Sequence, residues 1–317
     1  MSNEALDPRC TLLDASRSEC AVRAGSMLGG MKMMPWNVNK LRKIWRSKIR
    51  DFWFAAANVV EERIFPQHFF GKSPQGSEAQ YQSLFREAAS RSFPETKDIE
   101  ASVKFSIDTD WVNNLALHTQ VVRKPGLNWQ HGRVLYALLR SHISSASEAI
   151  ESITVFETGT ARGFSALCMA KALVDSGQPG MIITVDSLPH NDKMYWNCIS
   201  DVDGPKSRGE LLNRWPVEVG RVMFLQALTP HSLARIGLDR IHFAFLDAQH
   251  TFDSVVDEYE YVAARQLPGD IIVFDDVTPG VFDGVVKAVE KIRSLGEYEI
   301  VKLGREQERG YALARRL

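Results

Sequence analysis

The second half of the chain alternates short apolar runs with amphipathic stretches. From Ile153 onward, strand-like runs occupy 153–157, 181–186, 221–225, 241–247 and 271–275. Between them, apolar residues recur at helical spacing near 164–176, 252–266 and 281–294. Strands that alternate with helices form βαβ units. We therefore expect a doubly wound α/β fold, with helices on both faces of a mostly parallel sheet.

Two more strand-like runs close the chain, at 298–303 and 310–314, with only a short polar turn between them. Strands joined by so short a connection run antiparallel. The pattern therefore predicts a seven-stranded sheet that is Rossmann-like in its parallel part and ends in an antiparallel C-terminal hairpin.

Before Ile153 the periodicity is helical. It predicts an amphipathic helix within 36–64 and further helices at 78–91, 110–123 and 129–143. Residues 1–35 carry mixed charges without periodicity, so we expect disorder there, and several methionines after residue 26 leave the start of translation open. We divide the chain into this segment, a helical N-terminal region over 36–109, and the α/β domain over 110–317.

The stretch from Lys32 to Arg50 holds seven basic residues and no acidic one. A basic amphipathic helix of this kind can lie on an anionic membrane surface. Its apolar stripe equally suits packing on the α/β domain, and we favour this alternative because such stripes usually face a core. The N-terminal region would then cover the substrate side or form a homo-oligomer interface.

Composition narrows the class of partner. The formal net charge is −1, so overall electrostatics gives no indication that the protein binds nucleic acid. The four cysteines show no C-x-x-C spacing, which argues against structural zinc and a disulfide framework. No apolar run approaches the roughly 20 residues of a membrane span, and the first 30 residues lack the apolar core of a signal peptide. We expect a cytoplasmic protein.

A glycine-containing loop follows the first strand of the α/β domain, where Glu157, Gly159 and Gly163 form an E-x-G-x-x-x-G pattern ahead of a helix. Glycines allow the backbone to approach a ligand closely. Dinucleotide-binding dehydrogenases carry G-x-G-x-x-G at the same place. An acid at the strand end suits a cationic ligand better than a pyrophosphate, which favours S-adenosylmethionine.

Further acids lie at other strand ends. Asp186 ends the second strand, where an acid holds a ribose diol, although it could instead begin a turn. Asp247 ends the fourth strand, and Asp275 and Asp276 end the fifth. Three carboxylates at one edge of a sheet require a cation or protons, and oxygen ligands suit magnesium. Alternatively, Asp275 and Asp276 could cap the next helix, and Asp247 could only orient other groups.

His250 follows Asp247 by three residues. An unperturbed imidazole has a pKa near about 6.5, which suits a general base that removes a proton from a hydroxyl group. A metal would lower the pKa of that hydroxyl and position it. The alternative is a helix cap or a surface residue.

Together these motifs resemble the class I methyltransferases, and within them the branch of catechol O-methyltransferases and bacterial O-methyltransferases of macrolide sugars. The resemblance covers about residues 110–317. It rests on the E-x-G-x-x-x-G loop, on Asp186, on the run from Asp247 to Phe252, and on the run from Leu267 to Asp276. Asp270 departs from the glycine usual in that family, a change that we expect to affect only the turn.

The resemblance implies S-adenosylmethionine as methyl donor and magnesium at Asp247, Asp275 and Asp276. His250 would be the base, with Asp247 beside it, where catechol enzymes have lysine. The implied cofactor contacts are Glu157, Gly159, Thr160, Gly163, Ser165, Asp186, Ser187, Gln226, Ala227 and Asp247.

Residues 187–220 form a long insertion between two strands, and insertions of this length are usually functional or disordered. We expect the segment to cap the active site. Trp196, among polar residues, would suit stacking on a sugar or aromatic ring, whereas a plain surface position is an equal alternative for the cationic residues of the segment.

These observations predict an O-methyltransferase that uses S-adenosylmethionine, is assisted by magnesium, and acts on a hydroxyl of a small molecule or sugar. Three alternatives stay open: a metal-independent methyltransferase, an NAD-dependent oxidoreductase, and a non-catalytic binding protein of the same fold. The pair of Asp247 and His250 argues against the last, because a scaffold needs no base beside its cofactor.

Overall fold

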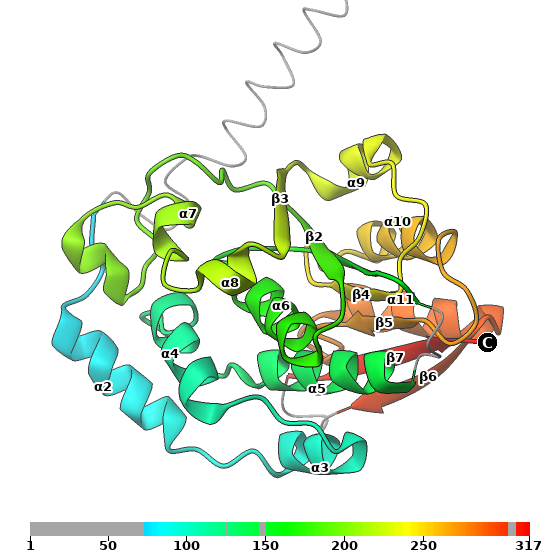
Figure 1. Cartoon of the computed structure of the whole chain (residues 1–317), viewed down its shortest axis with the longest axis horizontal. Helices are drawn as coiled ribbons and strands as arrows, with labels where there is room; N and C mark the ends of the chain where they lie inside the picture. Colours follow the sequence, from blue (N-terminus) through cyan, green and yellow to red (C-terminus); the bar gives the residue numbers. More distant parts are fainter. Residues whose placement is uncertain (1–72, 125, 146–149, 304–308) are drawn as a thin grey trace, which may run out of the picture. The chain divides into compact units, whose positions relative to one another are not determined.

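The computed structural model describes residues 73–124, 126–145, 150–303 and 309–317 (Figure 1). The predictions of disorder in 1–35 and of a basic helix within 36–64 lie outside these residues.

A seven-stranded sheet forms the centre of the fold, in the order β3-β2-β1-β4-β5-β7-β6. Its strands are β1 (Ile153–Thr158), β2 (Gly180–Asp186), β3 (Val222–Gln226), β4 (Phe243–Leu246), β5 (Ile271–Phe274), β6 (Tyr298–Leu303) and β7 (Tyr311–Arg316). The first five are parallel, and β7 runs antiparallel to both β5 and β6. The strand order reverses between β1 and β4, the position at which open α/β sheets bind their ligands. The predicted mostly parallel sheet with an antiparallel hairpin is confirmed.

Helices cover both faces of the sheet (Figure 1). They are α2 (Glu78–Ala89), α3 (Pro94–Val103), α4 (Thr109–Thr119), α5 (Gln130–Ser145), α6 (Phe164–Ser176), α7 (Arg208–Leu211), α8 (Pro216–Val219), α9 (Thr229–Ser232), α10 (Phe252–Ala263) and α11 (Asp283–Leu295). Adjacent strand residues join different cores, because side chains alternate across a strand. Val155 packs in the core with α4, α5 and α6, whereas Phe156 packs with α10 and α11.

Helix α3 is absent from the predicted elements, because its apolar stripe is weak. It begins with Pro94 in its first turn and carries a buried Glu100. Arg133 of α5 donates two hydrogen bonds to the Glu100 carboxylate, one of them from Nε at 2.9 Å. A contact between distant residues, rather than a local pattern, therefore stabilises this helix.

The described part of the N-terminal region shares a core with the sheet. Tyr81 of α2 and Ile107, which precedes α4, are buried in the same hydrophobic cluster as Val155 of β1. The predicted domain division at residue 110 stays a prediction.

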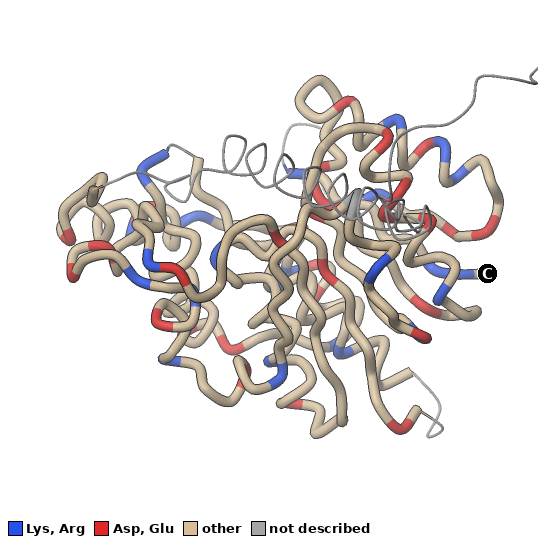
Figure 2. Tube along the Cα trace, turned by 90° about the horizontal axis from the view of Figure 1, so that it is seen from above, with Lys and Arg blue, Asp and Glu red and all other residues tan. Residues whose placement is uncertain are grey.

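Lysine and arginine are interspersed with aspartate and glutamate over the described trace (Figure 2). This distribution agrees with the net charge of −1. None of the helices among the described residues is long and apolar enough to cross a membrane.

Candidate active site

Glu157 lies at the end of β1 and is fully buried. Its partner in the parallel register is Thr184 of β2, whose hydroxyl donates a hydrogen bond to Oε2 of Glu157. Oε1 is buried and accepts no hydrogen bond from a described residue. Burial raises the pKa of Glu157 to about 7, although the hydroxyls of Ser165 and Thr184 oppose the shift. A carboxylate with one free oxygen fits a cationic ligand.

Two residues of the loop after β1 need the conformations that glycine allows. Gly159 has φ +90°, and a Cβ placed on it would lie 2.0 Å from the carbonyl oxygen of Asp247. Gly163 has φ +85° and caps the N-terminus of α6. The absence of a side chain at Gly159 therefore brings the loops after β1 and β4 together.

Asp186, at the end of β2, accepts hydrogen bonds from the backbone N–H groups of Ala161 (2.7 Å) and Leu188 (2.6 Å). Asp186 thus stabilises the loop after β1 and the turn after β2, and the second of these is the role in a turn that the sequence analysis gave as an alternative. Each carboxylate oxygen still has a lone pair for a ribose hydroxyl. Sequence analysis did not identify Arg208 as a support of the same region. Its buried side chain donates a hydrogen bond to the carbonyl of Ala161 (2.9 Å) and lies 3.7 Å from Asp186.

A cleft of about 260 Å³, which we call the cofactor cleft, opens at the carboxyl ends of the parallel strands. Its lining includes five predicted cofactor contacts: Gly159, Asp186, Ser187, Ala227 and Asp247. The other five do not line it. Glu157, Thr160, Gly163 and Ser165 are buried, and the mostly exposed Gln226 donates a hydrogen bond to the carbonyl of Ser187.

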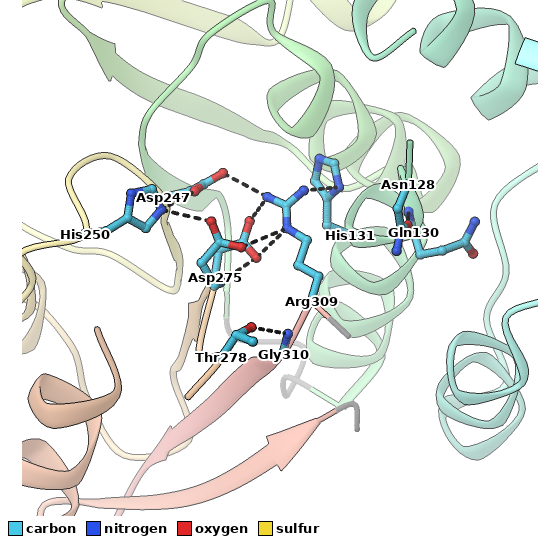
Figure 3. A network of polar contacts seen from close by, with 10 residues as sticks. Asn128, Gln130, His131, Asp247, His250, Asp275, Thr278, Arg309 and Gly310 are labelled. Carbon is cyan, nitrogen blue, oxygen red and sulfur yellow. Dashed lines mark hydrogen bonds and ion pairs between the residues drawn. The ribbon is translucent and has the colours of Figure 1, made fainter. Parts of the chain in front are cut away.

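Asp247 also belongs to a second group of polar side chains, which we call the acidic cluster (Figure 3). One ligand atom each of Asp247, His250 and Asp276 lies within 4.8 Å of the others. Nε2 of His250 is 2.9 Å from Oδ2 of Asp276 and 3.6 Å from Oδ1 of Asp247. The two carboxylates raise the pKa of His250 to about 10, so the imidazole is protonated near neutral pH. Its ring stacks on Phe282.

Asp275, the third predicted metal ligand, does not belong to this group and binds Arg309 instead. Its buried carboxylate accepts two hydrogen bonds from Arg309, one of them from Nε at 2.9 Å. Nη2 of Arg309 also donates to Asp247 (3.3 Å), and Nη1 lies 3.3 Å from Nδ1 of His131 (Figure 3). The sequence analysis missed Arg309, because no local motif marks an arginine just before β7.

The donors of the acidic cluster fit a divalent cation in part. Asp247, His250 and Asp276 offer two carboxylates and an imidazole at suitable separations. Asp275 is committed to Arg309. Burial and then the nearby charge of Asp275 hold the pKa of Asp247 well above its usual range, which a cation at this place would reverse.

The insertion between β2 and β3 has a small core of its own, made of Leu188, Met194, Trp196, Cys198 and Leu211. Trp196 is fully buried, and its Nε1 donates a hydrogen bond to the carbonyl of Lys206 (2.7 Å). The expected stacking of Trp196 on a substrate ring is therefore wrong. The segment borders the cofactor cleft only through Ser187 and Leu188.

Asp270 acts within its turn, as expected, and also outside it, where it pairs with a distant arginine. The carboxylate of this buried residue accepts a hydrogen bond from the backbone N–H of Leu267 and pairs with Arg240. Gly269 between them has φ +95°.

Several solved structures resemble this fold. One is the O-methyltransferase TomG from Streptomyces achromogenes, involved in tomaymycin synthesis and solved with S-adenosylmethionine. It is 17% identical, with a TM-score of 0.48 over 69% of this chain and 95% of that one. Another is an O-methyltransferase from Bacillus cereus, which is 16% identical, with a TM-score of 0.44 over 75% of this chain and 97% of that one. No curated protein matches the sequence.

Residues 156–277 match the family described as "Methyltransferase domain". The match begins within β1 and runs to the residue after Asp276, so it spans the cofactor cleft and the three residues Asp247, His250 and Asp276 of the acidic cluster. The part of the chain that holds the cofactor cleft therefore matches a methyltransferase domain, within a seven-stranded sheet of the predicted Rossmann-like type.

Proposed function

We propose that the chain is an O-methyltransferase that transfers a methyl group from S-adenosylmethionine to a hydroxyl of a small molecule, such as a sugar or glycosylated product. One observation carries the proposal: Asp247 lines the cofactor cleft and also belongs to the acidic cluster. A donor in the cleft and a hydroxyl at the cluster would therefore meet at one carboxylate, which suits an in-line transfer governed by positioning.

The residues around the cofactor cleft match the charge and shape of the donor. S-adenosylmethionine supplies the methyl group and carries ammonium and sulfonium charges. Glu157, near the end of β1, offers a buried carboxylate whose Oε1 accepts no hydrogen bond from a described residue. Asp186 retains lone pairs for the ribose diol, while Arg208 fixes the loop residue Ala161 that contacts it.

His250 is the residue that we assign to remove the proton of the acceptor hydroxyl. It acts as a base only after it has lost the proton that Asp247 and Asp276 stabilise. A second cation near these carboxylates would lower the pKa of the imidazole and prepare it for this role. Stacking on Phe282 holds the ring in place.

Magnesium held by the carboxylates of Asp247 and Asp276 would lower the pKa of the acceptor hydroxyl and position its oxygen, while His250 stays free to act as the base. A metal-independent reaction is the second candidate, and one observation favours it. Arg309 already contributes a fixed positive charge to Asp247 and Asp275, in place of the charge that a metal would bring.

Cytoplasmic localisation and homo-oligomerisation stay predictions.

A methylation screen with labelled S-adenosylmethionine tests the proposal. Polyols, sugars, glycosylated natural products and catechols are offered with magnesium or with EDTA. We expect methylation of at least one hydroxyl acceptor and a loss of more than about tenfold in the His250→Ala variant, since general bases contribute about 10²-fold or more. Near-full activity of that variant would refute the base assignment.

The same experiment separates the alternatives. Activity that survives EDTA and Asp276→Asn would favour the metal-independent reaction supported by Arg309. Tight binding of a nicotinamide dinucleotide without binding of S-adenosylmethionine would point to an oxidoreductase. Intact binding of S-adenosylmethionine with no methylated acceptor would point to a binding protein.

A further inference from the structure

A second cleft, which we call the outer cleft, adjoins the acidic cluster through Asp276. It has a volume of about 760 Å³, and its lining includes Asp276, Phe282 and Arg309. None of these three lines the cofactor cleft. A molecule in the outer cleft would therefore reach the acidic cluster without occupying the place of the donor.

The lining residues of the outer cleft that precede β1 in the sequence come from two connections between helices, while Thr278 and Val281 add to the lining from the loop after β5. Arg91 and Phe93 belong to the connection from α2 to α3, and Lys124 and Asn128 to the connection from α4 to α5. A neighbouring cavity of about 440 Å³ shares Arg91 and Lys124 with it. Arg91 and Lys124 therefore line both cavities.

The charges of the lining are not balanced. Asp276 pairs with His250, and the charge of Arg309 is taken up by Asp275. Within the described part of the chain, the ion-pair partner of Arg91 is the exposed Glu87, at 3.5 Å. Lys124 is exposed and forms no ion pair with a residue of the described chain.

The field of Lys124 extends into the site. Burial and then Arg309 lower the pKa of the His131 imidazole to about 3, and Lys124 adds to this effect. The outer cleft also has two half-buried aromatic side chains, Phe93 and Phe282, which can pack against a ring. The lining therefore suits a ring-containing molecule that carries a negative charge.

We propose that the hydroxyl acceptor carries an anionic group, a carboxylate or a phosphate, which Lys124 binds together with Arg91 while the hydroxyl lies at the acidic cluster. The inference rests on the proposed O-methyl transfer and names the class of its acceptor.

Binding to the full chain saturated with S-adenosylhomocysteine tests this proposal. Two matched ligands, 3,4-dihydroxybenzoate and 3,4-dihydroxybenzamide, share their hydroxyls and ring and differ in charge. Isothermal titration calorimetry should show tighter binding of the benzoate, by about fivefold for a partly exposed ion pair. The Lys124→Gln variant should lose most of this preference and keep only the part that Arg91 supplies. Lys291→Gln on the exposed face of α11 is the matched control and should keep the preference.

Equal binding of both ligands, no binding of either, or a preference unchanged in Lys124→Gln would overturn the inference. The Arg91→Gln variant should reduce the preference without removing it, because Glu87 already offsets part of that charge. These readouts need no methyl transfer. A charge preference that depends on Lys124 without methylation of any acceptor would refute the proposed function alone. Methylation that ignores acceptor charge would refute this inference alone.

Discussion

Glu157 combines full burial, one hydrogen-bonded oxygen and one free oxygen at the end of β1. Few buried carboxylates lack partners, because an unpaired charge is costly away from water. The arrangement is consistent with a group that is completed by a bound cation. Its pKa of about 7 links that role to pH.

The affinity for S-adenosylmethionine should therefore rise between pH 6 and pH 8. Below the pKa of about 7 Glu157 is protonated, and a cation would have to displace the proton, which weakens binding by up to tenfold per pH unit. Titration calorimetry across this range measures the effect. Glu157→Gln should bind more weakly and show only the titration of the ligand itself. A wild-type pH profile identical to that of the variant would contradict the assignment.

Gly159 offers a second test at the residue scale. Gly159→Ala should lose stability through its positive φ, by about 1–2 kcal/mol, and by about 1–3 kcal/mol more through the clash with the carbonyl of Asp247. Gly177→Ala is the control, since Gly177 has φ +68° but no atom within 4 Å of a Cβ. Urea unfolding of both variants measures the difference. Equal losses would mean that the close approach of the two loops contributes nothing.

At the scale of elements, the C-terminal hairpin places Arg309 beside the residues that directly follow β4 and β5. Asp275 and Asp247 follow parallel strands of the sheet, and Arg309 precedes the antiparallel strand β7, which pairs with β5. The hairpin thus brings a cation to carboxylates that lie far away in the sequence.

Arg309→Met should lower the free energy of unfolding by about 3–5 kcal/mol, because it leaves the buried Asp275 without its partner. A second change, Asp275→Asn, should restore part of the loss by removing the unpaired charge. Chemical denaturation of the single and double variants is the measurement. Equal destabilisation in both would show that packing of the arginine, rather than its charge, matters.

At the scale of the whole molecule, the sheet separates two hydrophobic cores that its strands hold together. Phe156 is fully buried in the core with α10 and α11, whereas Val155 lies in the core with α4, α5 and α6. Both cores contain residues of β1, so the strand that carries Glu157 depends on both.

Phe156→Ala should lower the free energy of unfolding by about 3–5 kcal/mol, as expected for a large side chain removed from a core. Phe252→Ala, where the residue is 39% exposed, is the matched control and should cost less than about 1 kcal/mol. Thermal unfolding followed by circular dichroism compares them. Similar losses would indicate that the exposed position is covered in solution.

The sequence by itself determined the fold class and the acids at the strand ends. Periods of apolar residues are local, and parallel strands necessarily present their carboxyl ends at one edge, so Glu157, Asp186 and Asp247 could be expected to lie there. Helix α3 was not predicted because its apolar stripe is weak, and the arginine that pairs with its Glu100, Arg133, lies 33 residues away.

Tertiary structure decided the rest. Arg309 meets His131 across 178 residues, and Arg208 supports the loop after β1 from an insertion 47 residues further along the chain. The same holds for Trp196, which looked like a binding platform and is instead a core residue of its own segment. Side-chain partners of this kind depend on where the connections fold back over the sheet, and local periodicity carries no information about that.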